Sequence, residues 1–212
     1  MKVELMLDLY CGAGGAAMGY YRAFGPDVRI VGVDHKPQPR YPFEFVQADA
    51  MEFMRDGRGD GFDFYHASPP CQRFSVTKSL HDKEYPDLIA PTRHALRMTG
   101  KPWVIENVPG APLENPLTLC GSSFGLGVRR HRLFETCPII VFRPFCFHHE
   151  QDAPLDVTGT GGPCPRHNKP RNVAGARAAM GIDWMTRPEL NEAIPPAYTE
   201  WIGRHIMEVE SA

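Results

Sequence analysis

The sequence lacks the features that mark several classes of protein. Its 212 residues contain no run of about 18 apolar residues, so we expect no transmembrane helix and no membrane partner. Acidic residues interrupt the N-terminal stretch MKVELMLDLY, which is not typical of a secretory signal peptide. Gly and Pro together make up 41 residues, below the roughly 25–30% that marks low-complexity chains. We therefore expect an ordinary globular chain rather than disorder, collagen or a coiled coil.

Cysteine and net charge are also low. The six Cys residues show no dense disulfide spacing, so we expect reduced thiols and a cytoplasmic protein. The net charge of −2 argues against a strongly basic nucleic-acid-binding protein, but the charge is unevenly distributed. Residues 129–177 carry eight Lys or Arg against four Asp or Glu. This segment is either a surface that faces a polyanion or a solvated loop with chance charges.

Short apolar segments alternate with helical ones through the first half of the chain. Expected strands cover residues 3–9, 29–34, 43–47, 62–67 and 103–107, and expected helices cover 16–23 and 88–99. This alternation is typical of an α/β domain with a parallel sheet. Short strands and turns follow to residue 141, and 143–170 show no periodicity. Two further helices are expected at 173–180 and 196–207, the second with Tyr198, Ile202 and Ile206 on one face.

The turn after the first expected strand is rich in glycine. Gly12-x-Gly14-x-x-Ala17 matches the G-x-G-x-x-G/A fingerprint of a nucleotide-binding turn between a strand and a helix. Asp34 ends the next strand, where a carboxylate that binds ribose hydroxyls belongs, and Asp49 follows the third, within reach of an adenine amine. We predict a nucleoside cofactor; the alternative is a tight turn with two surface acids.

A cysteine follows the expected strand at 62–67. In Ser68-Pro69-Pro70-Cys71-Gln72, two prolines hold Cys71 at the end of a strand in the middle of the sheet sequence, which suits a nucleophile. The thiolate is the reactive form, and basic neighbours would favour it. The alternative is a small buried cysteine.

The motifs along the chain resemble those of the DNA (cytosine-5) methyltransferase family. They occur in the family's order from residue 8 to about residue 203, nearly the whole chain, and a short member of phage type fits the length. The matching segments are Asp8-Leu9-Tyr10-Cys11-Gly12-Ala13-Gly14-Gly15, Pro70-Cys71-Gln72, Glu106-Asn107-Val108, Arg130-His131-Arg132 and Ala193-Ile194-Pro195-Pro196.

The resemblance implies a Rossmann-like class I S-adenosylmethionine-dependent methyltransferase fold with a small irregular recognition subdomain. It implies methylation of cytosine C5 in DNA, on a base flipped out of the helix, with S-adenosylmethionine as cofactor. Cys71 would attack C6, Glu106 would hold the N3 edge, and Arg130 and Arg132 would orient base and acid. The implied cofactor-binding residues are Tyr10, which would pack on the adenine, and Gly12, Gly14, Asp34, Asp49 and Pro70.

The resemblance also divides the chain. Residues 1–135 would form the catalytic and cofactor-binding core, 136–170 a reduced target-recognition segment, and 171–212 the C-terminal helices that complete the core. We expect a monomer in a prokaryotic or phage-infected cell, with DNA as its partner. The expected DNA contacts are Gln72, Arg143, Arg166, Lys169 and Arg171.

Two C-x-x-H units lie in the reduced segment. Cys146-x-x-His149 and Cys164-x-x-His167 can together supply four tetrahedral zinc ligands, with His148 and Cys137 as alternative ligands. A metal would help a loop that has too few apolar residues for its own core. The alternative is that these are polar loop residues that touch phosphates or solvent.

Two other functions remain open. The reduced recognition segment is compatible with C5-pyrimidine modification of free nucleotides or RNA. A catalytically silent DNA-binding scaffold is the non-enzymatic alternative, but such a scaffold has no need for Cys71, Glu106, Arg130 and Arg132 together.

Overall fold

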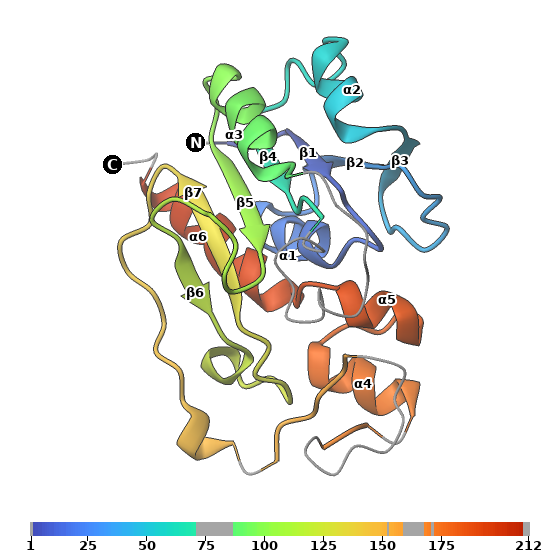
Figure 1. The fold of residues 1–212 in the computed structure, drawn as a ribbon, viewed down its shortest axis with the longest axis vertical. Helices are drawn as coiled ribbons and strands as arrows, with labels where there is room; N and C mark the ends of the chain where they lie inside the picture. The colour runs from blue at the N-terminus through green and yellow to red at the C-terminus, as the bar shows by residue number, and fades with distance from the viewer. Residues whose placement is uncertain (1, 71–86, 152, 159–167, 171, 210–212) are drawn as a thin grey trace.

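The computed structural model describes residues 2–70, 87–151, 153–158, 168–170 and 172–209 (Figure 1). A seven-stranded sheet in the order β3-β2-β1-β4-β5-β7-β6 forms its centre. The five strands from β3 to β5 pair in parallel, and β7 pairs antiparallel with both β5 and β6. The strands are β1 (Leu5–Leu9), β2 (Arg29–Asp34), β3 (Glu44–Gln47), β4 (Phe64–Ala67), β5 (Trp103–Asn107), β6 (Leu117–Leu119) and β7 (Arg132–Cys137).

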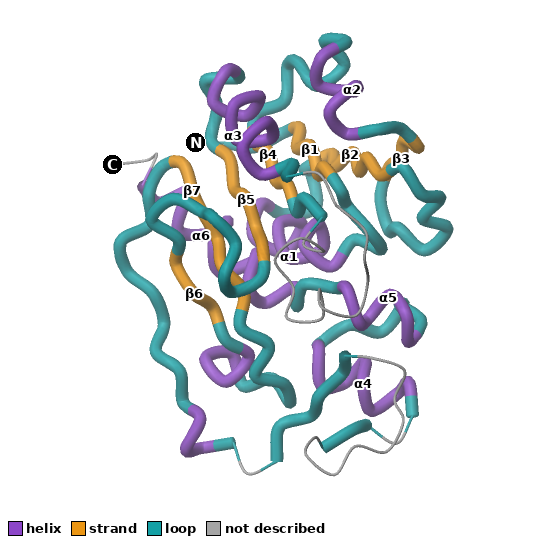
Figure 2. The backbone as a smooth tube through the Cα atoms, in the orientation of Figure 1, coloured by secondary structure: helices purple, strands orange, loops and turns teal. Residues whose placement is uncertain are grey.

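Helices cover both faces of this sheet (Figure 2). Side chains that alternate along the strands divide between two apolar clusters, as the two-residue period of a strand requires. The helices are α1 (Gly15–Phe24), α2 (Ala50–Arg55), α3 (Ile89–Met98), α4 (Val173–Met180), α5 (Arg187–Glu192) and α6 (Pro196–Val209). In β1, for example, Met6 packs into the cluster of α1 and α6, and Leu7 packs into the cluster of α2 and α3. The expected α/β class is confirmed. The sheet is parallel over the five strands that the sequence indicates, and β6 and β7 add an antiparallel edge that makes it mixed.

Helix α6 carries the apolar face that its sequence predicts. Tyr198, Ile202 and Ile206 are fully buried in the cluster that also contains Tyr20 of α1. The helix therefore returns from the far end of the chain to cover the sheet beside α1, as Figure 1 shows.

The segment between β7 and α6, which contains α4 and α5, packs around a smaller apolar cluster of its own. A third apolar cluster, with Val128, Met180, Met185 and Leu190 at its centre, joins α4 and α5 to the turn before β7. Residues 138–147, by contrast, have no helix or strand, which agrees with the lack of periodicity from residue 143 onwards, whereas the short strands expected up to residue 141 end with β7. A short 3-10 helix, η3 (His148–Glu150), directly follows them.

Two short helices were not expected from periodicity. Both α2 and α5 have six residues, too few for an apolar period to repeat, but each has a capping signal in its sequence. Asp49 accepts hydrogen bonds from the first backbone N–H groups of α2, and Thr186 and Glu189 form a capping box at α5. Among the described residues, no helix is long and apolar enough to cross a membrane.

Candidate active site

The glycine-rich turn after β1 is held by the acid at the end of β2. Asp34 Oδ2 accepts a hydrogen bond from Gly12 N at 3.1 Å, and Oδ1 accepts one from Lys36 N at 2.9 Å. Gly12 and Gly14 have φ of +49° and +82°, values that glycine adopts without the steric cost of a Cβ. The turn thus directs its backbone towards the space beyond the carboxyl ends of the strands.

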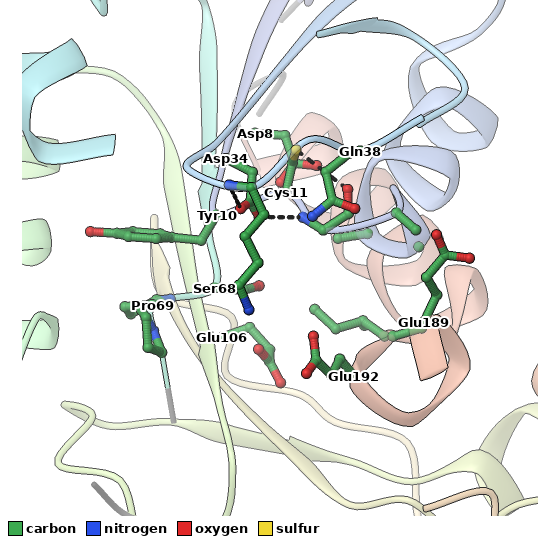
Figure 3. Close-up of a pocket in the computed structure, with 18 of the residues that line it drawn as sticks. Asp8, Tyr10, Cys11, Asp34, Gln38, Ser68, Pro69, Glu106, Glu189 and Glu192 are labelled. Carbon is green, nitrogen blue, oxygen red and sulfur yellow. Dashed lines mark hydrogen bonds between the residues drawn. The ribbon is translucent and has the colours of Figure 1, made fainter. Parts of the chain in front are cut away.

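A pocket opens at this edge of the sheet (Figure 3). Its walls come from the ends of β1, β2, β4 and β5, the position where ligands bind in open α/β sheets. Of the expected cofactor-binding residues, four line it: Tyr10, Gly12, Asp34 and Pro70. Gly14 does not line the pocket; it is the N-cap residue of α1.

Asp49 lies at the end of β3 but not in this pocket wall. Its Oδ1 accepts hydrogen bonds from Met51 N and Glu52 N, both at 2.9 Å, so the carboxylate caps α2. Tyr10, which lines the pocket, has its hydroxyl 3.1 Å from the hydroxyl of Thr92 on α3.

The C-terminal segment closes the pocket from the other side. Residues 191–194, from the motif Ala193-Ile194-Pro195-Pro196 and just before it, line the wall. The indole of Trp184 donates to Ala13 O at 2.8 Å, and the guanidinium of Arg40 binds both carboxylate oxygens of Glu189 at 2.8 and 2.9 Å. These contacts tie the segment to the glycine-rich turn and to the loop after β2.

Asp8, the first residue of the first matching motif, also lines the pocket, although no role was predicted for it. Its side chain is buried in β1, where Oδ2 accepts a hydrogen bond from the Tyr41 hydroxyl at 3.1 Å. Oδ1 is buried without a hydrogen-bond partner among the described residues. Burial raises the pKa of Asp8 to about 8, against the opposing effect of the Tyr41 hydrogen bond. The signal in the sequence is an acid inside an apolar strand.

Glu106 and Arg132 form an ion pair at the floor of the pocket. Arg132 Nε lies 3.1 Å from Glu106 Oε1, and both side chains are largely buried. The antiparallel pairing of β5 with β7 brings these residues together. Burial raises the pKa of Glu106, although Arg132, Arg130 and a hydrogen bond from Ser68 oppose the shift. The protonated form of Glu106 is thereby favoured relative to an exposed glutamate.

Arg130 lies beside this pair with unused donors. Its Nη2 donates to Asn191 O at 2.7 Å, but Nε and Nη1 are buried without a hydrogen-bond partner among the described residues. Burial and the neighbouring Arg132 lower the pKa of Arg130 to about 9. Two buried donor nitrogens without an acceptor are costly unless an acceptor is bound there.

A chain of hydrogen bonds reaches Glu106 from the interior. The Tyr20 hydroxyl lies 3.1 Å from His66 Nδ1, and His66 Nε2 lies 2.9 Å from Ser68 Oγ. Burial lowers the pKa of His66 to about 3, so the ring is neutral and has one donor and one acceptor. If Tyr20 donates to Nδ1, then Nε2–H donates to Ser68 and Ser68 donates to Glu106. Sequence reasoning missed this chain because His66 lies inside an apolar strand.

The strand that precedes the expected nucleophile is anchored from β5. Asn107 Nδ2 donates to Pro69 O at 3.0 Å, and Pro69 and Pro70 both line the pocket. Cys71 and Gln72 lie outside the described residues. The structure therefore places the two prolines that lead to Cys71 in the same pocket as Glu106 and Arg132.

The expected DNA-binding residues are only partly described. Arg143 is exposed on the segment after β7. The ammonium of Lys169 is bound within the protein, 2.8 Å from Asp156 Oδ2 and 2.6 Å from Thr158 O. Arg166 and Arg171 lie outside the described residues.

Of the expected metal ligands Cys146 and His149, only Cys146 belongs to a group of metal-ligating side chains among the described residues. Cys146 Sγ lies 3.7 Å from His131 Nε2, whereas the exposed side chain of His149 lies beside Glu150, 3.5 Å from Nε2 to Oε1. Cys164 and His167 lie outside the described residues.

The whole chain has counterparts among solved structures. An E. coli protein described as a prophage-encoded DNA modification methyltransferase matches with a TM-score of 0.60 and 15% identity, covering 98% of this chain and 99% of its own. The S. pombe Dnmt2 methyltransferase matches with a TM-score of 0.65 and 12% identity, covering 97% of this chain and 98% of its own. The fold is that of a class I S-adenosylmethionine-dependent methyltransferase. No protein-family model and no curated protein sequence matches the chain.

Proposed function

We propose that this protein methylates C5 of cytosine in DNA, with S-adenosylmethionine as the methyl donor and Cys71 as the nucleophile. The observation that carries the proposal is the buried pair of Glu106 and Arg132. It lies in the pocket that Asp34 and the glycine-rich turn also line, beside the prolines that directly precede Cys71. A carboxyl group and a guanidinium in one pocket, with a thiol next in the sequence after two prolines of its wall, are the groups that activation of a cytosine ring requires.

The pocket suits the proposed cofactor. The Asp34 carboxylate accepts one backbone N–H on each oxygen, and a carboxylate offers about four acceptor sites. It therefore retains acceptor sites for the hydroxyls of a ribose. Tyr10 supplies an aromatic surface for the adenine, and the unpartnered Asp8 Oδ1 supplies an acceptor for an ammonium group. When bound, S-adenosylmethionine supplies an electrophilic methyl group.

We keep Asp49 as a proposed contact to the adenine amine. Both hydrogen bonds that cap α2 go to Oδ1, which leaves Oδ2 for another donor. We propose that Gly14 contributes to cofactor binding indirectly, by allowing the shape of the glycine-rich turn. A Cβ at this position would overlap Pro42 and crowd Tyr41.

In the proposed reaction, the Cys71 thiolate adds to C6 of a flipped cytosine, and electron density moves to C5. Glu106 in its protonated form donates to N3, and Arg132 fixes the orientation of that carboxyl group. Once C5 carries the methyl group, loss of the C5 proton to a base expels the Cys71 thiolate and restores the ring. The two unpaired donor nitrogens of Arg130, Nε and Nη1, fit a substrate acceptor, such as a base carbonyl or a phosphate oxygen.

The division of the chain belongs to the same proposal. Residues 1–135 form the catalytic core, 136–170 the reduced target-recognition segment, and 171–212 the helices that complete the pocket. Gln72, Arg143, Arg166, Lys169 and Arg171 contact DNA, and of these Lys169 would first have to exchange its contact with Asp156. We propose a monomer that acts in the cytoplasm of a prokaryotic or phage-infected cell.

The first prediction tests the nucleophile. The purified chain is incubated with S-adenosylmethionine and DNA, and the digested nucleosides are separated by mass. We expect 5-methylcytosine, which Cys71→Ala abolishes because C5 is then not activated. DNA with 5-fluorocytosine should trap a covalent adduct with the parent chain and not with Cys71→Ala. Cys137→Ala, which removes an exposed thiol at the end of β7, should leave both results unchanged.

Other products would redirect the proposal. Methyl transfer to RNA or to free nucleotides, with DNA unmodified, would favour the alternative substrates. Methylated adenine or N4-methylcytosine, or full activity in Cys71→Ala, would contradict the covalent C5 mechanism. Tight DNA binding with no product from any substrate would favour the scaffold.

A further inference from the structure

Four metal-ligating side chains meet at a point outside the pocket. Cys120 follows β6, His131 directly precedes β7, and Cys146 and His148 lie in the irregular segment after β7. One ligand atom from each lies within 4.8 Å of each of the others. Cys120 Sγ is 3.2 Å from His148 Nε2, and Cys146 Sγ is 3.7 Å from His131 Nε2.

These distances are close to those of a tetrahedral zinc site. Zinc binds thiolate sulfur at about 2.3 Å and imidazole nitrogen at about 2.0–2.1 Å, which separates tetrahedral ligand atoms by about 3.3–3.8 Å. Of the two sulfur–nitrogen distances, 3.7 Å lies within this range and 3.2 Å lies just below it. No separation in the group exceeds the range by more than about 1 Å. Small side-chain movements therefore suffice to close the site around an ion.

We propose that Cys120, His131, Cys146 and His148 bind one structural Zn²⁺ ion. Two soft sulfur ligands and two imidazoles in a tetrahedral arrangement favour zinc over the harder cations. Binding releases the two thiol protons to solvent, and the two thiolates balance the charge of the ion. Four protein ligands leave no position for water or substrate, so the site is structural rather than catalytic.

The surroundings explain why the chain needs a metal here. Residues 138–147 form no helix or strand, and their apolar side chains at 139, 141, 142 and 145 are 61–82% exposed. Such a segment has no core of its own. A metal that joins Cys146 and His148 to Cys120 and His131 would fix it to the β6–β7 hairpin, in place of the missing apolar packing.

Hydrogen bonds already hold the ligands in this arrangement. Ser122 Oγ lies 3.1 Å from Cys120 Sγ and accepts a hydrogen bond from Phe147 N, also at 3.1 Å. Arg129 Nη2 donates to His148 O at 3.2 Å. Contacts of this kind orient metal ligands before the ion binds.

The site connects with the candidate active site through one residue. His131 lies between Arg130 and Arg132, and Arg132 holds Glu106. Fixing the His131 ring to a metal would restrict the backbone that carries both arginines. The ion would therefore position the guanidinium of Arg132 while also anchoring the segment proposed to meet DNA.

This set differs from the two C-x-x-H units that sequence spacing indicates. It shares Cys146 with them, replaces His149 by its neighbour His148, and takes Cys120 and His131 from the β6–β7 hairpin. The side chains of His148 and His149 therefore distinguish the two ligand sets, because only His148 belongs to the cluster.

The second prediction is the zinc content of the purified full-length chain, measured by mass spectrometry of the metal under reducing conditions. We expect about one zinc ion per chain, with two sulfur and two nitrogen ligands in X-ray absorption spectra. His148→Ala and Cys120→Ser should lose the ion, and the matched variant His149→Ala should keep it. None of these readouts depends on methyl transfer, so the result stands apart from the proposed function.

Three outcomes would overturn the site. The first is a parent chain that takes up no zinc after reduction and zinc supplementation. The second is loss of zinc in His149→Ala with retention in His148→Ala, which would favour the C-x-x-H pairs. The third is a parent chain in which Cys120 and Cys146 remain joined by a disulfide in the presence of a reducing agent, because neither sulfur could then bind zinc as a thiolate. If the variants of the proposed ligands fail to fold, His149→Ala decides between the two ligand sets, because it removes a ligand of the C-x-x-H pairs and none of the proposed site.

Discussion

Asp8 shows how burial changes the chemistry of one residue. Its carboxyl group lies inside β1, with one oxygen bound to Tyr41 and the other without a partner among the described residues. Because burial raises its pKa to about 8, the group is mostly protonated at neutral pH. A ligand that places an ammonium group nearby would favour the ionised form, so binding and proton release are coupled at this residue.

The third prediction follows from this pKa. The unfolded chain loses the Asp8 proton near pH 4 and the folded chain keeps it to about pH 8. The stabilising contribution of Asp8 is therefore complete below about pH 4 and is lost as the pH rises to about 8, with a slope of up to about 1.4 kcal/mol per pH unit. Asp8→Asn should remove that slope, as urea unfolding at several pH values would show.

The exposed carboxylate of Asp27 provides the control for this measurement. Asp27→Asn should keep the pH dependence of the parent chain. An identical slope in the parent and in Asp8→Asn would mean that the carboxyl group of Asp8 is hydrated or paired in solution.

At the scale of elements, the contact between α1 and α6 depends on glycine. A Cβ on Gly19 would overlap Pro196 O and Thr199 Oγ1, and one on Gly15 would overlap Ile194 O. The Thr199 hydroxyl also donates to Ala16 O at 2.8 Å across this contact. The close approach holds residues 191–194 in the pocket wall, so helix packing and the candidate cofactor site are coupled.

The fourth prediction compares two helical glycines. Gly19→Ala should destabilise the fold by about 1–3 kcal/mol, because the clash is with backbone that cannot move independently. The matched variant Gly175→Ala lies in α4, where the nearest atom to a new Cβ is 3.5 Å away. It should stabilise by up to about 1 kcal/mol through the higher helix propensity of alanine. Thermal or urea unfolding measures both; equal effects would contradict the α1–α6 packing.

At the scale of the whole molecule, the candidate site lies between a large α/β body and a small second part. The sheet supplies Asp8, Asp34, Glu106 and Arg132, and the segment from α5 to α6 closes the pocket. The proposed recognition segment is short, and residues 138–147 present few groups that hydrogen-bond base edges. If the proposed function holds, we therefore expect little direct readout of bases by residues 138–147.

The fifth prediction concerns the DNA target. Each bidentate contact in the major groove gives roughly 1–3 kcal/mol of discrimination, so few contacts imply a short site of about two to four base pairs. Phosphate contacts should dominate affinity, which should fall steeply with salt. Arg143→Ala should lower the salt slope by about one, whereas Arg55→Ala, an exposed arginine on α2, should not.

Bisulfite sequencing of methylated random DNA and salt titrations of binding provide these measurements. A strict target of six or more base pairs would mean that a partner or other residues of the chain supply the readout. Binding that does not change with salt would contradict the role of phosphate contacts.

The sequence alone determined the elements whose pattern is local. The strands at 29–34 and 103–107 and the helix at 173–180 were predicted with the bounds that the structure shows, because runs and periods of apolar residues report burial directly. The glycine-rich turn and the place of Asp34 at a strand end followed in the same way. The helices α2 and α5 were not predicted. Each has only six residues, which is too short for an apolar period, and a capping signal alone did not indicate a helix.

Only the tertiary structure decided which distant side chains meet. The resemblance implies that Arg132 orients Glu106, and the pairing of β5 with β7 is what brings the two side chains together. The path of the chain after β7 brings His148, rather than His149, to Cys120. Neither contact leaves a period or a fixed spacing in the sequence. The pattern of apolar residues along a helix or strand shows which face of that element is buried. The distance between side chains of different elements depends on how those elements pack and on the path of the loops that join them. For this reason three features could be found only from the tertiary structure. They are the set of metal ligands, the unpartnered oxygen of Asp8 and the hydrogen bonds of His66.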